Sequence, residues 1–177
     1  MRFSETFLRG AFVIDIEPVV DHRGAFARTF CAEEFRKHGL EYNMVQSNIS
    51  ITLKRNTIRG MHFQLGEAQE AKLVRCIRGA ILDVIIDIRK DSDTYAQHFM
   101  VELTSSNNKM LYVPRGIAHG FLTLEDDCHV FYQVSNFYAP NKENGIRWND
   151  PFFNVRWPIS NPILSEKDAS YEDFLLK

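Results

Sequence analysis

The sequence lacks a strong charge imbalance, a long hydrophobic run and a paired set of cysteines. Its 177 residues carry 21 basic and 23 acidic side chains, which gives a net charge of −2. Proteins that bind nucleic acid through its phosphates concentrate Lys and Arg, so this balance argues against that class. No apolar run approaches the roughly 20 residues of a membrane-spanning helix, and residues 1–9 show no signal-peptide core. We therefore expect a cytoplasmic protein that binds neither nucleic acid nor membranes.

The three cysteines, Cys31, Cys76 and Cys128, are widely separated and form no C-x-x-C pair. Neither a disulfide framework nor a zinc knuckle is indicated, so we expect small buried hydrophobic residues. No repeat or Ser/Gly-rich linker divides the chain, and its length suits one hydrophobic core. Residues 1–177 are therefore predicted to form a single domain.

Short segments that alternate between apolar and polar residues dominate the chain and predict β-strands. The predicted strands are Val45–Leu53, Thr57–Phe63, Leu73–Ile77, Ala80–Ile88, His98–Leu103, Lys109–Val113, Gly120–Leu124 and Val130–Val134. Only Cys31–His38 and a segment that begins at Ser165 indicate helices, the second because Ser165-x-x-Asp168 has the form of a capping box. The pattern predicts an all-β, antiparallel sandwich or jelly-roll barrel with short accessory helices.

Two of the predicted strands have faces that bear on a possible cavity. In Val45–Leu53 one face suits a core and the other, which is polar, suits water. The face assigned to the core comprises Val45, Ser47, Ile49, Ile51 and Leu53. In Ala80–Ile88, Asp83 and Asp87 share a face with isoleucines, and a carboxylate there needs a partner or water. A barrel with a polar, ligand-filled mouth satisfies both patterns, so a cavity is favoured.

Two histidine motifs lie on predicted strands or directly before them. Gly60-Met61-His62, followed later by Pro114-x-Gly116-x-x-His119, resembles the two half-motifs of the cupin superfamily. Metal-binding cupins surround one ion with H-x-H, a nearby Glu and a later His. Here Gln64 takes the place of the second His, and Ala68-Gln69 stand where the Glu would fall. One imidazole from each half cannot hold a metal tightly, so we expect no bound metal.

Further motifs follow one another in a fixed order over nearly the whole chain. They are Asp21–Phe26, Val45–Asn48, Arg59–Gln64, Lys72–Arg75, Pro114–Phe121, Tyr132 with Phe137–Pro140, Gly145–Pro151 and Leu164–Asp168. This series resembles the dTDP-4-dehydrorhamnose 3,5-epimerase family. The chain departs from that family at Met61-His62-Phe63, where many members have Leu-His-Tyr, and at Arg28, where many have Glu.

The resemblance implies a cupin-type antiparallel jelly-roll barrel and a cofactor-independent epimerase. Its substrate would be a nucleotide-diphosphate sugar, a 4-keto-6-deoxyhexose, whose C3 and C5 protons are acidic because the carbanion delocalises onto the C4 oxygen. The resemblance further implies a homodimer that exchanges N-terminal strands.

The same resemblance implies roles for individual residues. His62 is the base, Asp168 holds its imidazole, and Tyr132 is the acid on the opposite face of the sugar. Lys72 and His119 lie near the keto oxygen, where a cation or donor stabilises the developing oxyanion. The residues assigned to the nucleotide are Arg23 and Arg59 for the phosphates, Gln46 and Asn48 for the polar floor, and Phe26 and Tyr138 for the base or sugar.

Several of these residues also have a purely structural interpretation. His119 is equally typical of a hydrogen-bonded core histidine after a turn, and Tyr132 shares its face with two valines. Asp168 suits the acid of a capping box, and it serves both purposes only if that helix begins over the barrel mouth. Lys72 is the least natural core residue, because burial of an unpaired ammonium is costly.

The function has alternatives as well. One is a related epimerase that inverts C3 or C5 alone, and another is a noncatalytic cupin that only binds a sugar nucleotide. A metal-dependent dioxygenase is disfavoured by the missing ligands.

Overall fold

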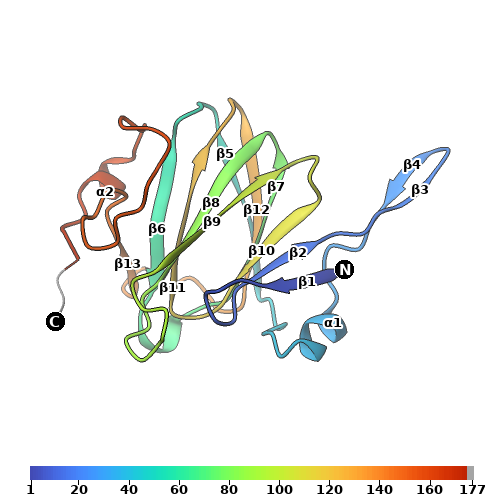
Figure 1. Cartoon of the computed structure of the whole chain (residues 1–177), viewed down its shortest axis with the longest axis horizontal. Coiled ribbons are helices and arrows are strands. Elements are labelled where there is room, and N and C mark those ends of the chain that lie inside the picture. The colour runs from blue at the N-terminus through green and yellow to red at the C-terminus, as the bar shows by residue number, and fades with distance from the viewer. Residues whose placement is uncertain (175–177) are drawn as a thin grey trace.

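The structure is a computed structural model that describes residues 1–174, and it consists mainly of two antiparallel sheets that face each other (Figure 1). Residues 175–177 of the expected domain lie outside the described chain. The six-stranded sheet has the order β1-β2-β10-β7-β12-β5, and the five-stranded sheet has the order β13-β6-β11-β8-β9. The strands β3 and β4 form a separate hairpin.

The bounds of the strands are β1 Arg2–Glu5, β2 Phe12–Asp15, β3 Val19–Asp21, β4 Gly24–Phe26, β5 Gln46–Thr52, β6 Ile58–Gln64, β7 Lys72–Arg78, β8 Ala80–Asp87, β9 His98–Thr104, β10 Lys109–Val113, β11 Ile117–Thr123, β12 Cys128–Val134 and β13 Glu143–Gly145. The helices are α1 Ala32–Lys37, the 3₁₀ turn η1 Gly66–Ala68 and α2 Glu166–Ala169. No helix in the described part of the chain is long and apolar enough to cross a membrane.

The predicted all-β fold with short accessory helices is confirmed, and each predicted strand is present with ends that shift by a few residues. The largest shift is at β11, which begins at Ile117 and not at Gly120. The strands β1 to β4 and β13 were not predicted. Each has only three or four residues, too few for an alternating pattern to stand out from a loop.

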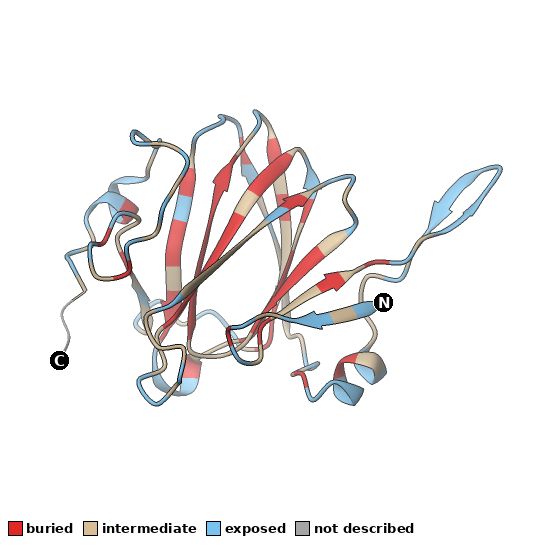
Figure 2. Ribbon diagram, viewed as in Figure 1, coloured by how far each residue is buried: buried red, intermediate tan, exposed pale blue. Residues whose placement is uncertain are grey.

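The main hydrophobic core fills the space between the two sheets (Figure 2). Val74, Leu111 and Val130 reach it from the six-stranded sheet, and Ile85 and Phe121 reach it from the five-stranded sheet. Burial of this apolar surface is the main force that holds the sheets together. The buried cysteines Cys76 and Cys128 belong to the same core as free thiols, whereas Cys31 is half-buried.

The assignment of the two faces of Val45–Leu53 was wrong. Ile49, Ile51 and Leu53 are 53%, 51% and 69% exposed. On the opposite, polar face of β5, Gln46, Asn48 and Ser50 are half-buried and Thr52 is buried. The strand β5 is the edge of its sheet. Its inner face lines a polar cleft and does not pack into the hydrophobic core. Alternation fixes which side chains share a face but not which face turns inward.

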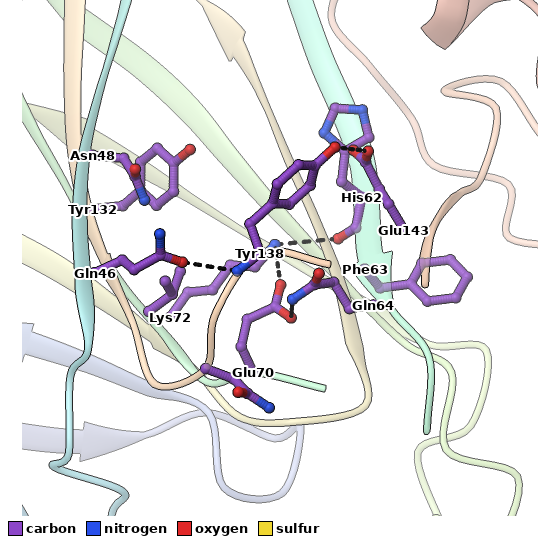
Figure 3. Close-up of a pocket in the computed structure, with 12 residues that line it drawn as sticks. Gln46, Asn48, His62, Phe63, Gln64, Glu70, Lys72, Tyr132, Tyr138 and Glu143 are labelled. Carbon is purple, nitrogen blue, oxygen red and sulfur yellow. Dashed lines mark hydrogen bonds and ion pairs between the residues drawn. The ribbon is translucent and has the colours of Figure 1, made fainter. Parts of the chain in front are cut away.

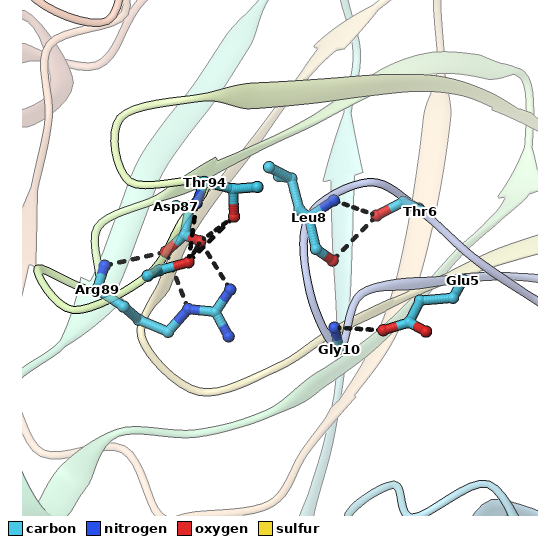
Figure 4. Close-up of polar contacts among 8 residues, drawn as sticks. Glu5, Thr6, Leu8, Gly10, Asp87, Arg89 and Thr94 are labelled. Atoms are coloured by element: carbon cyan, nitrogen blue, oxygen red, sulfur yellow. Dashed lines mark hydrogen bonds and ion pairs between the residues drawn. The ribbon is translucent and has the colours of Figure 1, made fainter.

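The carboxylates on the face of β8 have partners, as the sequence requires. Asp87 is fully buried, and it accepts hydrogen bonds from Arg89, Ser92 and Thr94, with oxygen-to-donor distances of 2.6 to 3.0 Å (Figure 4). Burial alone would raise the pKa of Asp87, but these donors lower it to about 2. The cluster ties residues 89–94 to the end of β8.

Candidate active site

A polar cleft opens between the sheets, where β5, β7 and β12 face β6 and β13 (Figure 3). One cavity of about 420 Å³ and a second of about 270 Å³ share His62, Lys72 and Tyr132, so they form one continuous cleft. The second cavity is also lined by Arg59, His119 and Asp168. Residues far apart in the sequence thus meet here, including the five to which the resemblance gives a part in the chemistry: His62, Lys72, His119, Tyr132 and Asp168.

Two glycines bring β6 and β11 close together beside the cleft. A Cβ atom at Gly60 would lie 2.5 Å from the Cα of Gly120, and one at Gly120 would lie 2.7 Å from the carbonyl oxygen of Arg59. Only glycine fits at such a close approach of two backbones. In the register of these strands His62 lies opposite His119, so both imidazoles line the cleft.

His62 and Asp168 form a close pair at the mouth of the cleft. The Nε2 atom of His62 lies 2.7 Å from Oδ1 of Asp168, and the carboxylate is almost fully buried. A carboxylate can only accept, so Nε2 carries hydrogen and the lone pair of the neutral ring lies on Nδ1. The second oxygen of Asp168 accepts from the backbone N–H of Gly60 at 3.3 Å. The imidazole is therefore held in one tautomer and one orientation.

The start of α2 places this carboxylate. Ser165 is the N-cap, and its hydroxyl accepts from the backbone N–H of Asp168 at 3.0 Å, as the predicted capping box requires. The side chain of Asp168 turns to His62 instead of completing the box. Burial alone would raise the pKa of Asp168, but hydrogen bonds from His62, Gly60 and Ser165 and the charge of His62 lower it. Asp168 thus stays ionised behind the imidazole.

Tyr132 lies across the cleft from His62, on β12 of the other sheet. Burial raises the pKa of its phenol, and the negative charges of Glu70 and Glu143 raise it further, against the opposing effect of Arg59. The hydroxyl therefore keeps its proton at neutral pH and can donate it.

Lys72 and His119 complete the polar lining of the cleft. The Nζ atom of Lys72 lies 3.3 Å from Oε1 of Glu70 and 3.4 Å from the carbonyl oxygen of His62. The Nε2 atom of His119 lies 2.7 Å from Oδ1 of Asp83, which is fully buried on β8. Each of the two residues thus has a buried carboxylate partner and also lines the cleft.

The residues that the resemblance assigns to the nucleotide divide into two groups, of which the first lies in the cleft. Gln46, Asn48 and Tyr138 line the larger cavity and Arg59 the smaller one. The side-chain oxygen of Gln46 accepts from the backbone N–H of Tyr138 at 2.8 Å, which joins the edge strand β5 to the loop after β12.

The second group, Arg23 and Phe26, does not line the cleft of its own chain. Both lie on the β3–β4 hairpin, which projects away from the sheets (Figure 1). Arg23 pairs with Asp21 at 2.5 Å, and Phe26 is 72% exposed. Arg28, the departure from the family pattern, follows this hairpin and is also exposed.

Sequence reasoning missed four residues at the cleft. Glu143 accepts from Lys167 and from the hydroxyl of Tyr138, at 2.6 Å in each case, and these contacts lower the pKa of Glu143 although burial opposes them. Glu70 pairs with Lys72, and the ring of Tyr171 packs edge-on against His62 with 6.3 Å between the centroids. Only Lys167 had a signal, because it precedes Asp168 in the same motif.

No group of three or more His, Cys, Asp or Glu residues within 1–174 is arranged to hold a metal ion. The expectation that the protein needs no metal or other cofactor stays a prediction, which elemental analysis of the purified protein can test.

The fold and the cleft together define a cupin-type jelly roll whose cleft can carry out acid–base chemistry on a polar ligand. It contains a histidine paired with a carboxylate, a lysine and, on the opposite side, a protonated tyrosine. Comparison with known proteins gives the family. The sequence model of the family described as dTDP-4-dehydrorhamnose 3,5-epimerase matches residues 5–175. The chain belongs to this family, and it is an epimerase.

Individual relatives agree with this assignment. The dTDP-4-dehydrorhamnose 3,5-epimerase of Methanothermobacter thermautotrophicus is 43% identical over 97% of this chain and 93% of its own length. The crystal structure of the Bacillus anthracis enzyme of the same name, with TDP and PPi bound, has a TM-score of 0.94 and 36% identity over 98% of this chain and 99% of that one. A 3'-monoepimerase from Streptomyces bikiniensis in complex with dTDP-quinovose has a TM-score of 0.88 and 31% identity, covering 95% and 85% of the two chains.

Proposed function

We propose that this chain inverts C3 and C5 of a dTDP-linked 4-keto-6-deoxyhexose, through an enolate formed in the cleft. One observation carries the proposal: the His62–Asp168 pair and Tyr132 line one cavity from opposite sheets. Epimerisation needs a base on one face of the sugar ring and an acid on the other. A ring bound between β6 and β12 meets both.

The proton transfers follow from this arrangement. Nδ1 of His62 takes the proton from C3 or C5, and the electron pair left on carbon moves onto the C4 oxygen. The ammonium of Lys72 stabilises that oxygen as its negative charge develops. The hydroxyl of Tyr132 then gives its proton to the opposite face of the carbon, which inverts the centre. Exchange with water restores both side chains.

The environments of the acid and the base suit these roles. The ionised Asp168 stabilises the imidazolium that forms when His62 accepts a proton. The raised pKa of Tyr132 keeps its phenol protonated until it transfers the proton to the carbanion. The different surroundings of His62 and Tyr132 thus suit one side chain to act as the base and the other as the acid.

Nucleotide binding is supported by the polar wall beside this centre. Arg59 provides a cation for the diphosphate, and Gln46, Asn48 and Tyr138 provide amides and an aromatic surface. TDP in the Bacillus anthracis relative supports the choice of a dTDP-sugar.

A second copy of the chain would supply Arg23 and Phe26. An isolated two-stranded hairpin is marginally stable in water, yet β3–β4 exposes Val19, Val20 and Phe26, each by more than 70%. A partner surface for this hairpin is therefore expected, and the hairpin carries the cation and the aromatic ring that the nucleotide still requires.

The exposed outer face of β5 supports the same homodimer. The side chains of Ile49, Ile51 and Leu53 form an apolar row on an edge strand, which is typical of a surface that another protein chain covers. Light scattering should give the mass of a dimer. A monomer whose mass does not change with concentration would contradict this part of the proposal.

The number of inverted centres is tested by incubation with dTDP-4-keto-6-deoxyglucose in heavy water. Deuterium at both C3 and C5, with product of inverted configuration, is the expected result. Label at one carbon only would favour the mono-epimerase, the activity named for the Streptomyces bikiniensis relative. Absence of label at both would refute epimerisation of this substrate. The cytoplasmic location expected from the sequence stays a prediction.

A further inference from the structure

A second carboxylate lies directly behind the lysine of the cleft. Glu70 precedes β7, and its side chain is 7% exposed, while the side chain of Lys72 is 11% exposed. Oε1 of Glu70 lies 3.3 Å from Nζ of Lys72 (Figure 3). Neither charge has free access to water, so each depends on the other for compensation.

Gln64 fixes the position of this carboxylate. Its amide nitrogen donates to Oε2 of Glu70 at 2.7 Å and also to the carbonyl oxygens of Ala68 and Phe137, at 3.0 and 3.2 Å. Its side-chain oxygen accepts from the backbone N–H of Ala139 at 2.6 Å. The residue that replaces the second histidine of a metal-binding cupin is thus the anchor of a hydrogen-bond network.

The network determines where the ammonium of Lys72 can lie. It is held between Glu70 and the carbonyl oxygen of His62, the residue that bears the base. Lysine has a long stem with many rotamers, and without a fixed partner it would not hold its charge at one point. Both oxygens of Glu70 are occupied by Lys72 and Gln64, so Glu70 itself is not placed to exchange protons with a ligand.

We propose that Glu70 is a positioning residue, whose carboxylate, held by Gln64, fixes the ammonium of Lys72 beside His62 where the oxyanion of the substrate develops. This inference rests on the proposed role of Lys72 in the epimerisation. Glu70 then contributes to the transition state and little to the binding of the nucleotide, because the oxyanion exists only during the reaction.

The test compares Glu70→Gln with Glu67→Gln. The first keeps the size of the side chain and removes its charge. The second is a matched control, since Glu67 lies in the same turn, is largely exposed and pairs with Lys142. Turnover and KM with the keto sugar are measured, together with the affinity for dTDP alone by calorimetry.

For Glu70→Gln we expect kcat to fall by about tenfold, less than the roughly 10²- to 10³-fold loss when a direct oxyanion donor is removed. KM and the Kd for dTDP should stay within about twofold of the values for the unmodified chain. A fall in kcat without a change in KM marks an interaction that is made only in the transition state. Glu67→Gln should match the unmodified chain.

Two results would overturn the inference. One is a kcat for Glu70→Gln within about twofold of the unmodified chain, and the other is a loss of kcat matched by an equal loss of dTDP affinity, which marks a general disruption of the cleft. If Glu70→Gln does not fold, as judged by circular dichroism, Glu70→Asp takes its place. It keeps the charge but lengthens the ion pair, so it should lower kcat without lowering dTDP affinity. An unmodified chain without exchange at C3 or C5 refutes the proposed function itself, which is a separate result.

Discussion

The substitution Asp168→Asn tests whether the buried carboxylate contributes to the basicity of His62 or only begins helix α2. Asparagine has nearly the same size and keeps an oxygen that can accept from Nε2 of His62. It also keeps the backbone N–H that donates a hydrogen bond to the hydroxyl of Ser165. The cap of the helix is therefore preserved, and the main loss is the negative charge behind the imidazole.

The size of the effect follows from the geometry of the pair. With Nε2 and Oδ1 2.7 Å apart, the centres of charge of an imidazolium and a carboxylate lie about 4 Å apart. At an effective dielectric constant of about 20 this attraction is worth about 4 kcal/mol. The His62 side chain is 32% exposed, so water screens part of it, and about 2 to 4 kcal/mol remains for the protonated base. Since each 1.36 kcal/mol is tenfold in rate, kcat should fall roughly 30- to 1000-fold.

The assay follows deuterium entry at C3 and C5 by NMR, beside the rate of product formation. Asp126→Asn is the matched control, because that carboxylate accepts from the backbone N–H of Arg55 on the surface, away from the cleft. If only Asp168→Asn loses activity, and circular dichroism shows that this variant is folded, the result supports a role for the Asp168 carboxylate in the basicity of His62. If Asp168→Asn keeps kcat within threefold of the unmodified chain, the carboxylate does not act on the base.

Three further predictions address the acid, the base and the stability of the fold. His62→Ala should abolish exchange at both C3 and C5, and substantial residual exchange would remove His62 as the base. Tyr132→Phe should still exchange the substrate protons but form inverted product slowly; product formation at the normal rate would exclude Tyr132 from the mechanism. The pKa of Asp87 is about 2 against an ordinary 3.8, so its ionised form stabilises the folded chain by roughly 2 kcal/mol at neutral pH. This stability is complete above about pH 4 to 5 and is lost as the pH falls through about 2. Urea unfolding of Asp87→Asn should therefore show a deficit at pH 7 that shrinks toward pH 2, and a deficit independent of pH would contradict the assignment.

The family and most of the strands could be predicted because both depend on local information. Alternation over five or more residues defines a strand whatever its partners are, and β10 was predicted with its observed bounds. The motifs around His62 and Asp168 indicated the chemistry because each residue type is needed for a particular task. The capping form of Ser165-x-x-Asp168 likewise predicted where α2 begins.

The polar network of the site could not be predicted, because its contacts depend on how the strands and the loops between them pack, which the local sequence pattern does not record. Glu143 lies on a three-residue strand without a pattern of its own, and Glu70 acquires its partner only when β6 and β7 bring Gln64 and Lys72 together. The position of Arg23 could not be predicted for a different reason. The β3–β4 hairpin that carries it projects away from the sheets of its own chain (Figure 1).

The sequence by itself determined the class of the fold, the family and the residue types that the reaction requires. The tertiary structure alone decided which face of β5 turns inward, and that Glu143 meets Lys167 and the hydroxyl of Tyr138 at the cleft. The physical reason is that periodicity records which side chains share a face, whereas burial and pairing depend on what the opposite sheet places against that face. The apolar row of Ile49 and Ile51 faces outward for this reason, and the polar row opposite it lines the cleft.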